Sequence, residues 1–406
     1  MNEQNKKVPT VRFKGFTNDW EQRKLGEVIL DYKRKNNNDR LPVLTSSFQG
    51  IEYQEKHFGS QQKHDTSDYN VLPKEYMTYR NRSDNGYFRF NINNLGVTGI
   101  VSKFYPVFTT INTNKLFLAS YINHNHRLKN HFKVVSVGTS QHVLSLRNFK
   151  KTNLLFPSKD EQDQIGKFFN LLNRAITLQQ RKLDLLKQLK KGLLQKMFAD
   201  KDSKSPVLRF KIFHDDWEQR KLGDISKTKR GLTYKPSNID NTGIRVLRSS
   251  NIKEDTFVIS DDDVFVKESA VNIPFVENGD ILITAANGST NLVGKHAIIR
   301  DIPKNSAVHG GFMLITTSKE YEFLNALMSS NWYKKFIKKY VAGGNGAIGN
   351  LRKNDLDNQK IYVPKKDEQE KIGNFFKMLD SLITLHQRKQ NHLKLLKKSL
   401  LQQMFM

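Results

Sequence analysis

The chain has 406 residues, more than one hydrophobic core usually holds, so we expect two domains. Its 67 lysines and arginines exceed its 40 aspartates and glutamates, and the resulting charge of +27 favours a nucleic-acid partner, although a lysine-rich coding bias would also give this composition. The absence of cysteine excludes disulfides, thiolate metal sites and cysteine nucleophiles. Because no apolar run is long enough for a membrane span or a signal peptide, we expect a soluble, cytoplasmic protein with no membrane partner.

The first distinctive segment of the chain is repeated later in it. Residues Val11–Glu27 read VRFKGFTNDWEQRKLGE, and residues Leu208–Asp224 read LRFKIFHDDWEQRKLGD, with 12 of 17 positions identical. We call these the lead segments. Trp20 corresponds to Trp217, which is an offset of 197 residues. An internal repeat of this length indicates a duplicated domain.

The long segments that follow the two lead segments share little. Residues 28–150 and 225–350 have in common only short strand-like phrases, such as LPVLTSS at Leu41–Ser47 and IRVLRSS at Ile244–Ser250. Two domains that perform one kind of task on two different targets would diverge in this way. The expected fold class is α+β, with two similar α/β-type domains. We expect the divisions 1–156 for the first domain, 157–204 for a helix and linker, 205–363 for the second domain and 364–406 for a second helix.

A second repeated segment is helical. Pro157 and Pro364 end strand-like runs, and the following segments, Asp160–Lys182 and Asp367–Lys389, match at an offset of 207 residues. Apolar residues recur there at alternating spacings of three and four, which is typical of a coiled-coil seam. The expected seam residues are Phe168, Leu172, Ile176, Leu183, Leu186, Leu193, Phe375, Leu379, Ile383, Leu393, Leu396 and Leu400.

The connectivity predicts the direction of the two helices. The first helix delivers the chain to the second domain, so the start of the second helix should lie near the end of the first. The helices would then pack antiparallel, with an approximate two-fold axis and one domain at each end of a rod about 58 Å long at about 1.5 Å per residue. Polar Gln179 and His386 fall near the middle of the seam, where a register role and a merely hydrated position are equally compatible with the sequence. Metal binding or base catalysis by His386 is disfavoured because no carboxylate or second histidine accompanies it at ligand spacing.

Catalytic motifs are not convincing in this sequence. Asn272–Phe275 has one proline where an adenine methyltransferase needs two, and the glycine cluster Val341–Gly346 lacks the flanking strand and helix of a methyl-donor loop. The segment GSTNLVGKH at Gly288–His296 misses the phosphate-loop spacing and is interpreted as a hairpin turn. The acidic run Asp261–Asp263 is interpreted as a solvated turn rather than a nuclease site.

Several polar and basic residues are candidates for DNA contact. Arginine suits guanine edges, asparagine and glutamine suit adenine, and phosphates accept hydrogen bonds from almost any donor. For each candidate we favour a phosphate contact or a solvated charge over base reading. The candidates are Tyr79, Arg80, Arg82, Arg89, Gln141, His142, Arg245, Arg248, Asn251, Lys295 and Asn345.

The repeated motifs resemble those of a known family. FTNDWEQRKLGE at Phe16–Glu27 and FPSKDEQDQIGKFF at Phe156–Phe169, each occurring twice, are similar to the conserved regions of specificity subunits of type I restriction-modification enzymes. The resemblance implies two target-recognition domains that each read half of a bipartite, asymmetric site in double-stranded DNA. It also implies that two methylation subunits dock on the helices and that restriction subunits complete the complex. S-adenosylmethionine, ATP and magnesium would then act on these partners, and this chain would have no cofactor or catalysis of its own.

Two alternatives stay open at this stage. The chain could be a self-sufficient methyltransferase or nuclease, in which case it would turn over DNA without partners. It could instead be an architectural or regulatory DNA-binding protein whose helices pair between two chains. An internal helix pair predicts a monomer, so the mass of the isolated protein separates these possibilities.

Overall fold

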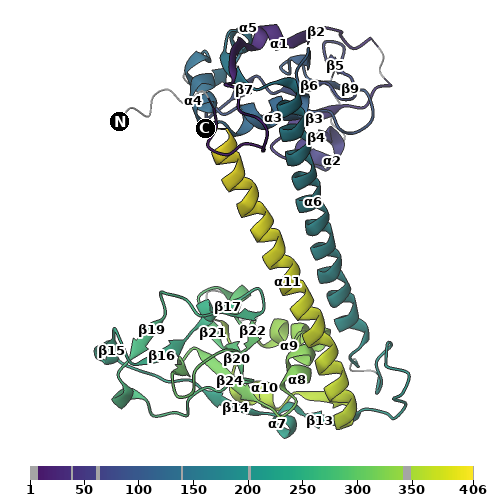
Figure 1. Cartoon of the computed structure of the whole chain (residues 1–406). Helices are drawn as coiled ribbons and strands as arrows, with labels where there is room; N and C mark the ends of the chain where they lie inside the picture. The colour runs from purple at the N-terminus through teal and green to yellow at the C-terminus, as the bar shows by residue number, and fades with distance from the viewer. Residues whose placement is uncertain are drawn as a thin grey trace. The chain divides into compact units, whose positions relative to one another are not determined.

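The computed structural model describes residues 8–37, 40–60, 65–138, 140–199, 203–341 and 349–405. The chain divides into two compact units, of which unit 1 combines Met1–Gln180 with Arg388–Met406 and unit 2 comprises Arg181–Gln387. The division cuts both long helices, α6 (Lys159–Lys196) and α11 (Lys366–Met404), so each unit holds one end of each helix. Figure 1 shows the C-terminal end of α11 next to the start of α6 in unit 1.

Unit 1 is an α+β domain built around an antiparallel sheet. Its elements before α6 are β1 (Glu21–Lys24), α1 (Leu25–Val28), β2 (Ile29–Tyr32), β3 (Leu44–Ser47), β4 (Gly50–Tyr53), α2 (Gln54–Phe58), β5 (Asn70–Leu72), β6 (Met77–Tyr79), β7 (Arg82–Ser83), β8 (Phe90–Ile92), β9 (Gly99–Val101), β10 (Val107–Thr110), α3 (Lys115–His124), α4 (His126–Val135), β11 (His142–Val143), α5 (Leu146–Lys150) and β12 (Asn153–Phe156). The main sheet has the order β2-β10-β6-β8, and β1 pairs with β12. Asn114 begins α3 because its side chain accepts hydrogen bonds from the backbone N–H groups of Leu116 and Phe117.

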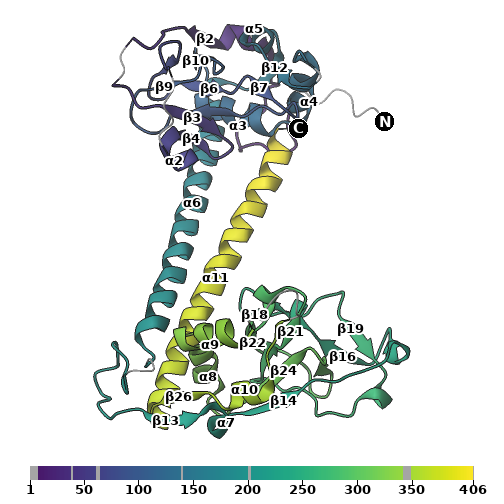
Figure 2. The same ribbon diagram turned by 180° about the vertical axis from the view of Figure 1, so that it is seen from behind.

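Unit 2 repeats this plan with additions. Its elements before α11 are β13 (Glu218–Lys221), α7 (Leu222–Ile225), β14 (Lys227–Arg230), η1 (Pro236–Asn238), β15 (Ile239–Asp240), β16 (Ile244–Leu247), η2 (Ser249–Asn251), β17 (Ile252–Lys253), β18 (Thr256–Phe257), β19 (Val264–Val266), η3 (Glu268–Ala270), β20 (Ile281–Thr284), β21 (Ala286–Asn287), η4 (Thr290–Leu292), β22 (His296–Ile298), β23 (Ala307–His309), β24 (Met313–Thr317), α8 (Tyr321–Met328), α9 (Asn331–Val341), β25 (Gly349–Asn350), α10 (Lys353–Asp357) and β26 (Lys360–Val363). The sheet β14-β24-β20-β22 corresponds to the main sheet of unit 1, and a further sheet has the order β15-β19-β16-β23. Figure 2 shows α8 and α9 beside the first turns of α11. The predicted α+β class and the internal repeat are confirmed.

Aromatic residues of the repeated segments join each domain to the two helix ends by matched contacts. In unit 1, the Phe405 ring lies 6.0 Å from Phe117 and 5.6 Å from Phe169 between centroids, and Trp20 lies 6.1 Å from Phe117. The same contacts recur in unit 2 with these pairs and distances: Phe198 to Phe323 5.8 Å, Phe198 to Phe376 5.9 Å and Trp217 to Phe323 6.4 Å. The start of one helix therefore packs beside the end of the other in both units, which is the antiparallel arrangement that the sequence predicted.

A buried ion pair ties each lead segment to the first turn of a helix. The guanidinium of Arg12 donates to both carboxylate oxygens of Glu161, at 2.9 and 2.7 Å. Arg209 makes the same bidentate pair with Glu368, at 2.7 Å for both bonds. The side chains of the two glutamates are 1% and 2% exposed. The hydrogen bonds to these glutamates raise the pKa of Arg12 and of Arg209, so both guanidinium groups stay charged.

The repeated glycine of the helical motif marks a close approach of backbone to helix. A Cβ atom on Gly166 would lie 2.6 Å from Oδ1 of Asn114 and 2.9 Å from the backbone nitrogen of Phe117. A Cβ atom on Gly373 would lie 2.7 Å from the backbone nitrogen of Phe323. Glycine is therefore required at both positions because no side chain fits between the long helix and the start of α3 or α8.

The helix seam follows most of the predicted positions and departs from them in two places. Predicted seam residues that are buried or half-buried are Leu172, Ile176, Leu183, Leu186, Leu193, Leu379, Ile383, Leu393 and Leu400. Leu396 is 41% exposed, so its prediction was wrong, and the neighbouring Lys397 is half-buried instead. Lys397 lies near Arg89 and His124 of unit 1, so this position contributes to the contact of α11 with the domain.

The second departure concerns the phenylalanine pairs. Phe168 and Phe375 were assigned to the seam, but they are only half-buried. They pack on the lead segments, with centroid distances of 5.6 Å to Phe13 and 6.0 Å to Phe210. Their neighbours Phe169 and Phe376 contact the opposing helix end instead, as described above. The motif needs two adjacent phenylalanines because one covers the lead segment and the other covers the second helix.

Candidate nucleic-acid interface

Four predicted DNA-contact residues of unit 1 lie together around a short two-stranded ribbon. β7 and β11 pair antiparallel, with Arg82 opposite Val143 and His142 opposite Ser83. The guanidinium of Arg82 lies 3.8 Å from the centroid of the Phe104 ring. Nε2 of Gln141 donates to Asp84 at 3.3 Å, and Arg80 is exposed just before the ribbon. The ribbon therefore presents basic and amide groups from two separate loops.

Unit 2 has a ribbon at the corresponding place with different residues. β21 and β25 pair antiparallel, with Ala286 opposite Asn350 and Asn287 opposite Gly349. The side chain of Asn287 donates to the hydroxyl of Ser249 at 3.1 Å, which brings the η2 turn next to the ribbon. Our sequence analysis missed Asn287 and Asn350, and the signal that could have revealed them was their small, turn-forming neighbours. Asn345 was predicted to contact DNA and lies outside the described residues, as does most of the glycine cluster that contains it.

Tyr79 is a core residue, and its proposed role in DNA contact was wrong. The side chain is fully buried, its hydroxyl donates to the carbonyl of Leu144 at 3.0 Å, and its ring lies 4.6 Å from Phe90. Burial raises the pKa of its hydroxyl. Tyr79 supports the ribbon from beneath because it comes just before β7 and bonds to the residue after β11.

Three predicted residues of unit 2 form an internal network around one carboxylate. Asp263 is buried, and it accepts hydrogen bonds from Arg245 at 2.5 Å and from Asn251 at 2.8 Å. Asn251 is completely buried, so DNA cannot reach it. Asp261 and Asp262 form the exposed turn that we expected, and only Asp263 departs from that prediction because it is buried. Arg248 donates to the carbonyl of Asp262 at 3.0 Å, although its side chain keeps a partly exposed position. The network therefore holds the η2 turn in place.

The remaining two candidates, Arg89 and Lys295, occupy equivalent positions in the two units. Phe90 pairs with Tyr79 in unit 1, and His296 pairs with Ile283 in unit 2, so the preceding residues Arg89 and Lys295 correspond. The segment Gly288–His296 lies in the connection between β20 and β22, which pair antiparallel, so the predicted hairpin is present, and the short η4 turn lies within it.

The long helices carry a second apolar stripe that their seam does not cover. Leu171, Leu178 and Leu185 recur every seven residues on α6 and are 53%, 62% and 65% exposed. On α11, Met378 and Leu385 stand at the positions equivalent to Leu171 and Leu178, and they too are exposed. Exposed apolar residues that repeat along a helix are typical of a protein-binding face.

Neither a metal site nor a membrane segment is found in the ranges that the structure describes. No group of three or more histidine and carboxylate side chains in these ranges is placed to hold a metal ion. None of the helices in them combines the length and the apolar character that crossing a bilayer requires.

Comparison with known proteins agrees with the repeated architecture. The family model of the type I restriction modification DNA specificity domain matches the chain twice, over residues 17–188 and 214–395. The specificity subunit of the type I restriction enzyme MjaVIII of Methanocaldococcus jannaschii is 24% identical over 322 residues, which cover 76% of this chain and 73% of that protein.

Two solved structures share the fold at low sequence identity. The crystal structure of a type I restriction-modification S subunit from M. genitalium has a TM-score of 0.63 and 14% identity, covering 98% of this chain and 99% of the other. A structure described as the basis of complex assembly and conformational transition of a type I system has a TM-score of 0.50 and 14% identity, covering 96% and 98%. Because the family model matches both repeats over most of the sequence, the chain belongs to the type I restriction-modification DNA specificity family.

Proposed function

We propose that this chain reads a bipartite, asymmetric DNA site, with each unit recognising one half. The observation that carries the proposal is the contrast between matched and unmatched parts of the two units. The lead segments and helix ends repeat contact by contact, while the ribbons differ, with Arg82 and His142 in one and Asn287 and Asn350 in the other. Different hydrogen-bond donors and acceptors recognise different base edges. Two ribbons with different side chains, held by the same arrangement of lead segments and helices, therefore suit two different half-sites.

The helices provide the surface for the catalytic partners in this proposal. Two methylation subunits dock on the exposed apolar residues of the long helices, such as Leu178 on α6 and Leu385 on α11, and restriction subunits join them. S-adenosylmethionine, ATP and magnesium act on those subunits, and this chain supplies DNA recognition without catalysis. The exposed leucines support this role because they have the spacing of a helix face and lie outside the seam.

A segment exchange tests the bipartite reading. Replacing residues 28–150 with the corresponding segment of another family member should change one half of the methylated site and leave the other half unaltered. Methylome sequencing of cells that carry the chimaera with its methylation subunits reads both halves directly. A change in both halves, or in neither, would contradict the assignment of one half-site to each unit.

Charged substitutions in the stripe test the docking surface. Leu178→Glu and Leu385→Glu should each abolish co-purification with the methylation subunit, because a buried unpaired charge at an interface is strongly unfavourable. Leu30→Glu is the matched control, since Leu30 is 55% exposed on β2 and lies outside the stripe. Equal recovery of the methylation subunit with all three variants would rule out this surface.

Measurements on the isolated chain test the two rival functions. In the proposed role it is monomeric by mass and does not turn over DNA when given S-adenosylmethionine and magnesium. A dimer would favour helices that pair between chains. Methylation or cleavage without partners would identify a self-sufficient enzyme.

A further inference from the structure

Each unit places cations from three separate elements at one equivalent position. The first cation precedes β8 or β22, namely Arg89 in unit 1 and Lys295 in unit 2. The second is the fourth residue of the helix α4 or α9, namely Lys129 or Lys334. The third comes from the end of a long helix, where Lys397 and Lys190 correspond at the 207-residue offset. We call these sets the basic cluster of unit 1 and the basic groove of unit 2.

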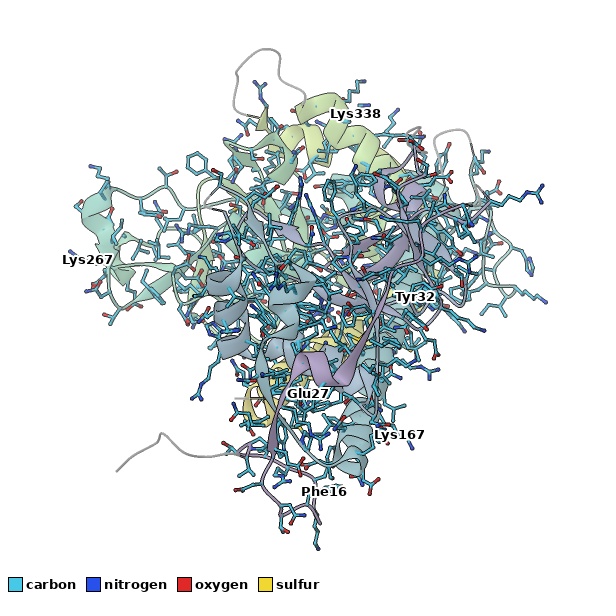
Figure 3. All side chains as sticks on the ribbon, turned by 90° about the horizontal axis from the view of Figure 1, so that it is seen from above. Phe16, Glu27, Tyr32, Lys167, Lys267 and Lys338 are labelled. Carbon is cyan, nitrogen blue, oxygen red and sulfur yellow. The ribbon has the colours of Figure 1, made fainter. Side chains whose placement is uncertain are left out.

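In unit 2 the three lysines line a cavity of about 1090 Å³. Lys338, which is labelled in Figure 3, lines the same cavity one turn further along α9 than Lys334. The cavity also contains acidic side chains, and two of them form ion pairs. Lys190 contacts Asp380 at 2.5 Å, and Lys187 contacts Glu254 at 3.3 Å. Part of the positive charge of the groove is therefore neutralised within the protein.

In unit 1 the equivalent cations lack such counter-ions. The residue equivalent to Asp380 is Asn173, which carries no charge. No ion pair joins Arg89, Lys129 or Lys397 to a carboxylate in the described part of the chain, and Nε of Arg89 is buried there without a hydrogen-bond acceptor. Burial first, and then the charge of Arg89, lower the pKa of Lys129 and of Lys397. The cations therefore repel one another in the unliganded protein.

Mutual repulsion of partly buried cations is costly unless an anion binds between them. The aspartate–asparagine difference at the equivalent helix positions, Asp380 and Asn173, makes this cost larger in unit 1 than in unit 2. A DNA backbone supplies closely spaced phosphates that carry a single negative charge each. Such phosphates suit a cluster whose cations come from the residue before a strand, from a short helix and from a long helix.

We propose that the basic cluster of unit 1 binds DNA phosphates beside its half-site, and that Asp380 and Glu254 weaken the equivalent groove of unit 2. The two units then contribute unequally to the salt-dependent part of DNA affinity. This inference rests on the DNA-reading function proposed above. It identifies the residues that contact the DNA phosphates, and it assigns the larger contribution to DNA affinity to unit 1.

Three substitutions in the full-length chain test the proposal with a random-sequence duplex, by fluorescence anisotropy over a series of KCl concentrations. Lys397→Gln should weaken binding about fivefold at moderate salt and reduce the slope of log affinity against log salt by about 0.9, as expected for one lost phosphate contact. Asn173→Asp, which introduces the counter-ion of unit 2, should weaken binding about threefold. Asp380→Asn, which removes that counter-ion, should strengthen binding about twofold to threefold.

The outcomes distinguish failure of the phosphate-binding proposal from failure of the proposed DNA-reading function. If the wild-type chain binds no duplex, the DNA-reading function itself fails. If the wild type binds but Lys397→Gln and Asn173→Asp leave the affinity and the salt slope unchanged, the basic cluster is not a phosphate site. Loss of methylation-subunit binding with unchanged DNA affinity would also overturn it, since the cations would then serve an acidic protein surface. Asn173 is exposed, so its substitution decides the matter even if Lys397→Gln alters folding.

Discussion

The repeated and the divergent parts of the two units obey different constraints. We call the lead segments and the long helices α6 and α11 the frame, and the divergent parts are residues 28–150 and 225–350. In the frame, Arg12 and Arg209, Gly166 and Gly373, and Phe405 and Phe198 make matched contacts at nearly equal distances. In the other parts of the units, the main sheets keep the same strand order. Unit 2, however, has the four-stranded sheet β15-β19-β16-β23 where unit 1 has the strand pairs β3-β4 and β5-β9, and the residues of the ribbons differ. The frame tolerates little sequence change because each unit must pack against the same pair of helices. Surfaces that bind different targets must differ in sequence.

Removing one partner of the buried ion pair should produce the largest effect on the frame. Arg12→Met leaves the buried carboxylate of Glu161 without its guanidinium, and we expect unit 1 to lose about 3–5 kcal/mol of unfolding free energy. Arg209→Met should destabilise unit 2 by a similar amount. Hydrogen exchange of the β2–β10 and β14–β24 strand pairs reports the two units separately. Identical exchange in a variant and the wild type would mean that the pair is not a support of the frame.

The close approach of helix and backbone, which both units share, should give the next largest effect. Gly166→Ala and Gly373→Ala force a methyl group against backbone atoms, and each should cost about 1–3 kcal/mol. Gly192→Ala is the matched control on the same helix type, because nothing lies within 4 Å of its added Cβ. That substitution should stabilise the protein by about 0.5–1 kcal/mol through better helix propensity. Thermal unfolding measures all three, and destabilisation by Gly192→Ala alone would contradict the steric explanation.

Buried histidines should make the two units differ in acid. Burial lowers the pKa of His124 in unit 1 and of His309 in unit 2 to about 4, and burial also lowers the pKa of His296 in unit 2. Folding therefore favours the neutral rings, so stability is complete above the unfolded pKa of about 6.5 and falls as the pH drops towards 4. At pH 5 each of the first two should cost about 2 kcal/mol.

The two histidine rings have different charged neighbours. Arg89, Lys397 and Lys129 lower the pKa of His124 further, whereas Asp280 raises that of His309 and Lys229 lowers it. Unit 2 has two such rings and should lose protection from hydrogen exchange first between pH 6.5 and pH 5. His309→Gln should reduce this difference, and earlier loss of protection in unit 1 would contradict the explanation.

Sequence reasoning predicted the frame well and the candidate DNA-contact residues poorly, for physical reasons. The frame has repeated motifs, apolar residues at alternating spacings of three and four, and a connectivity that fixes the direction of the helices. Each of these features can be recognised in the amino-acid sequence. Leu396 was misassigned because apolarity favours leucine, whereas the structure leaves Leu396 exposed and half-buries Lys397 near Arg89 and His124 of the same unit. Tyr79 and Asn251 were misassigned because strands and turns of three residues give no clear indication of which face is buried.

The smallest expected effect concerns an exposed cation near the unit 1 ribbon. Arg80 is exposed next to β7, so Arg80→Gln should leave stability unchanged. If Arg80 meets a phosphate, its loss weakens binding of all duplexes by about 1 kcal/mol and lowers the salt slope by about 0.9. If it reads a base edge, the affinity falls for the cognate half-site alone. Arg23→Gln is the matched control, because Arg23 is also exposed in unit 1 but pairs with Glu21 at 2.7 Å within the frame. Anisotropy titrations with cognate and random duplexes distinguish the two roles, and equal losses for Arg80→Gln and Arg23→Gln would show that the ribbon has no special part in binding DNA.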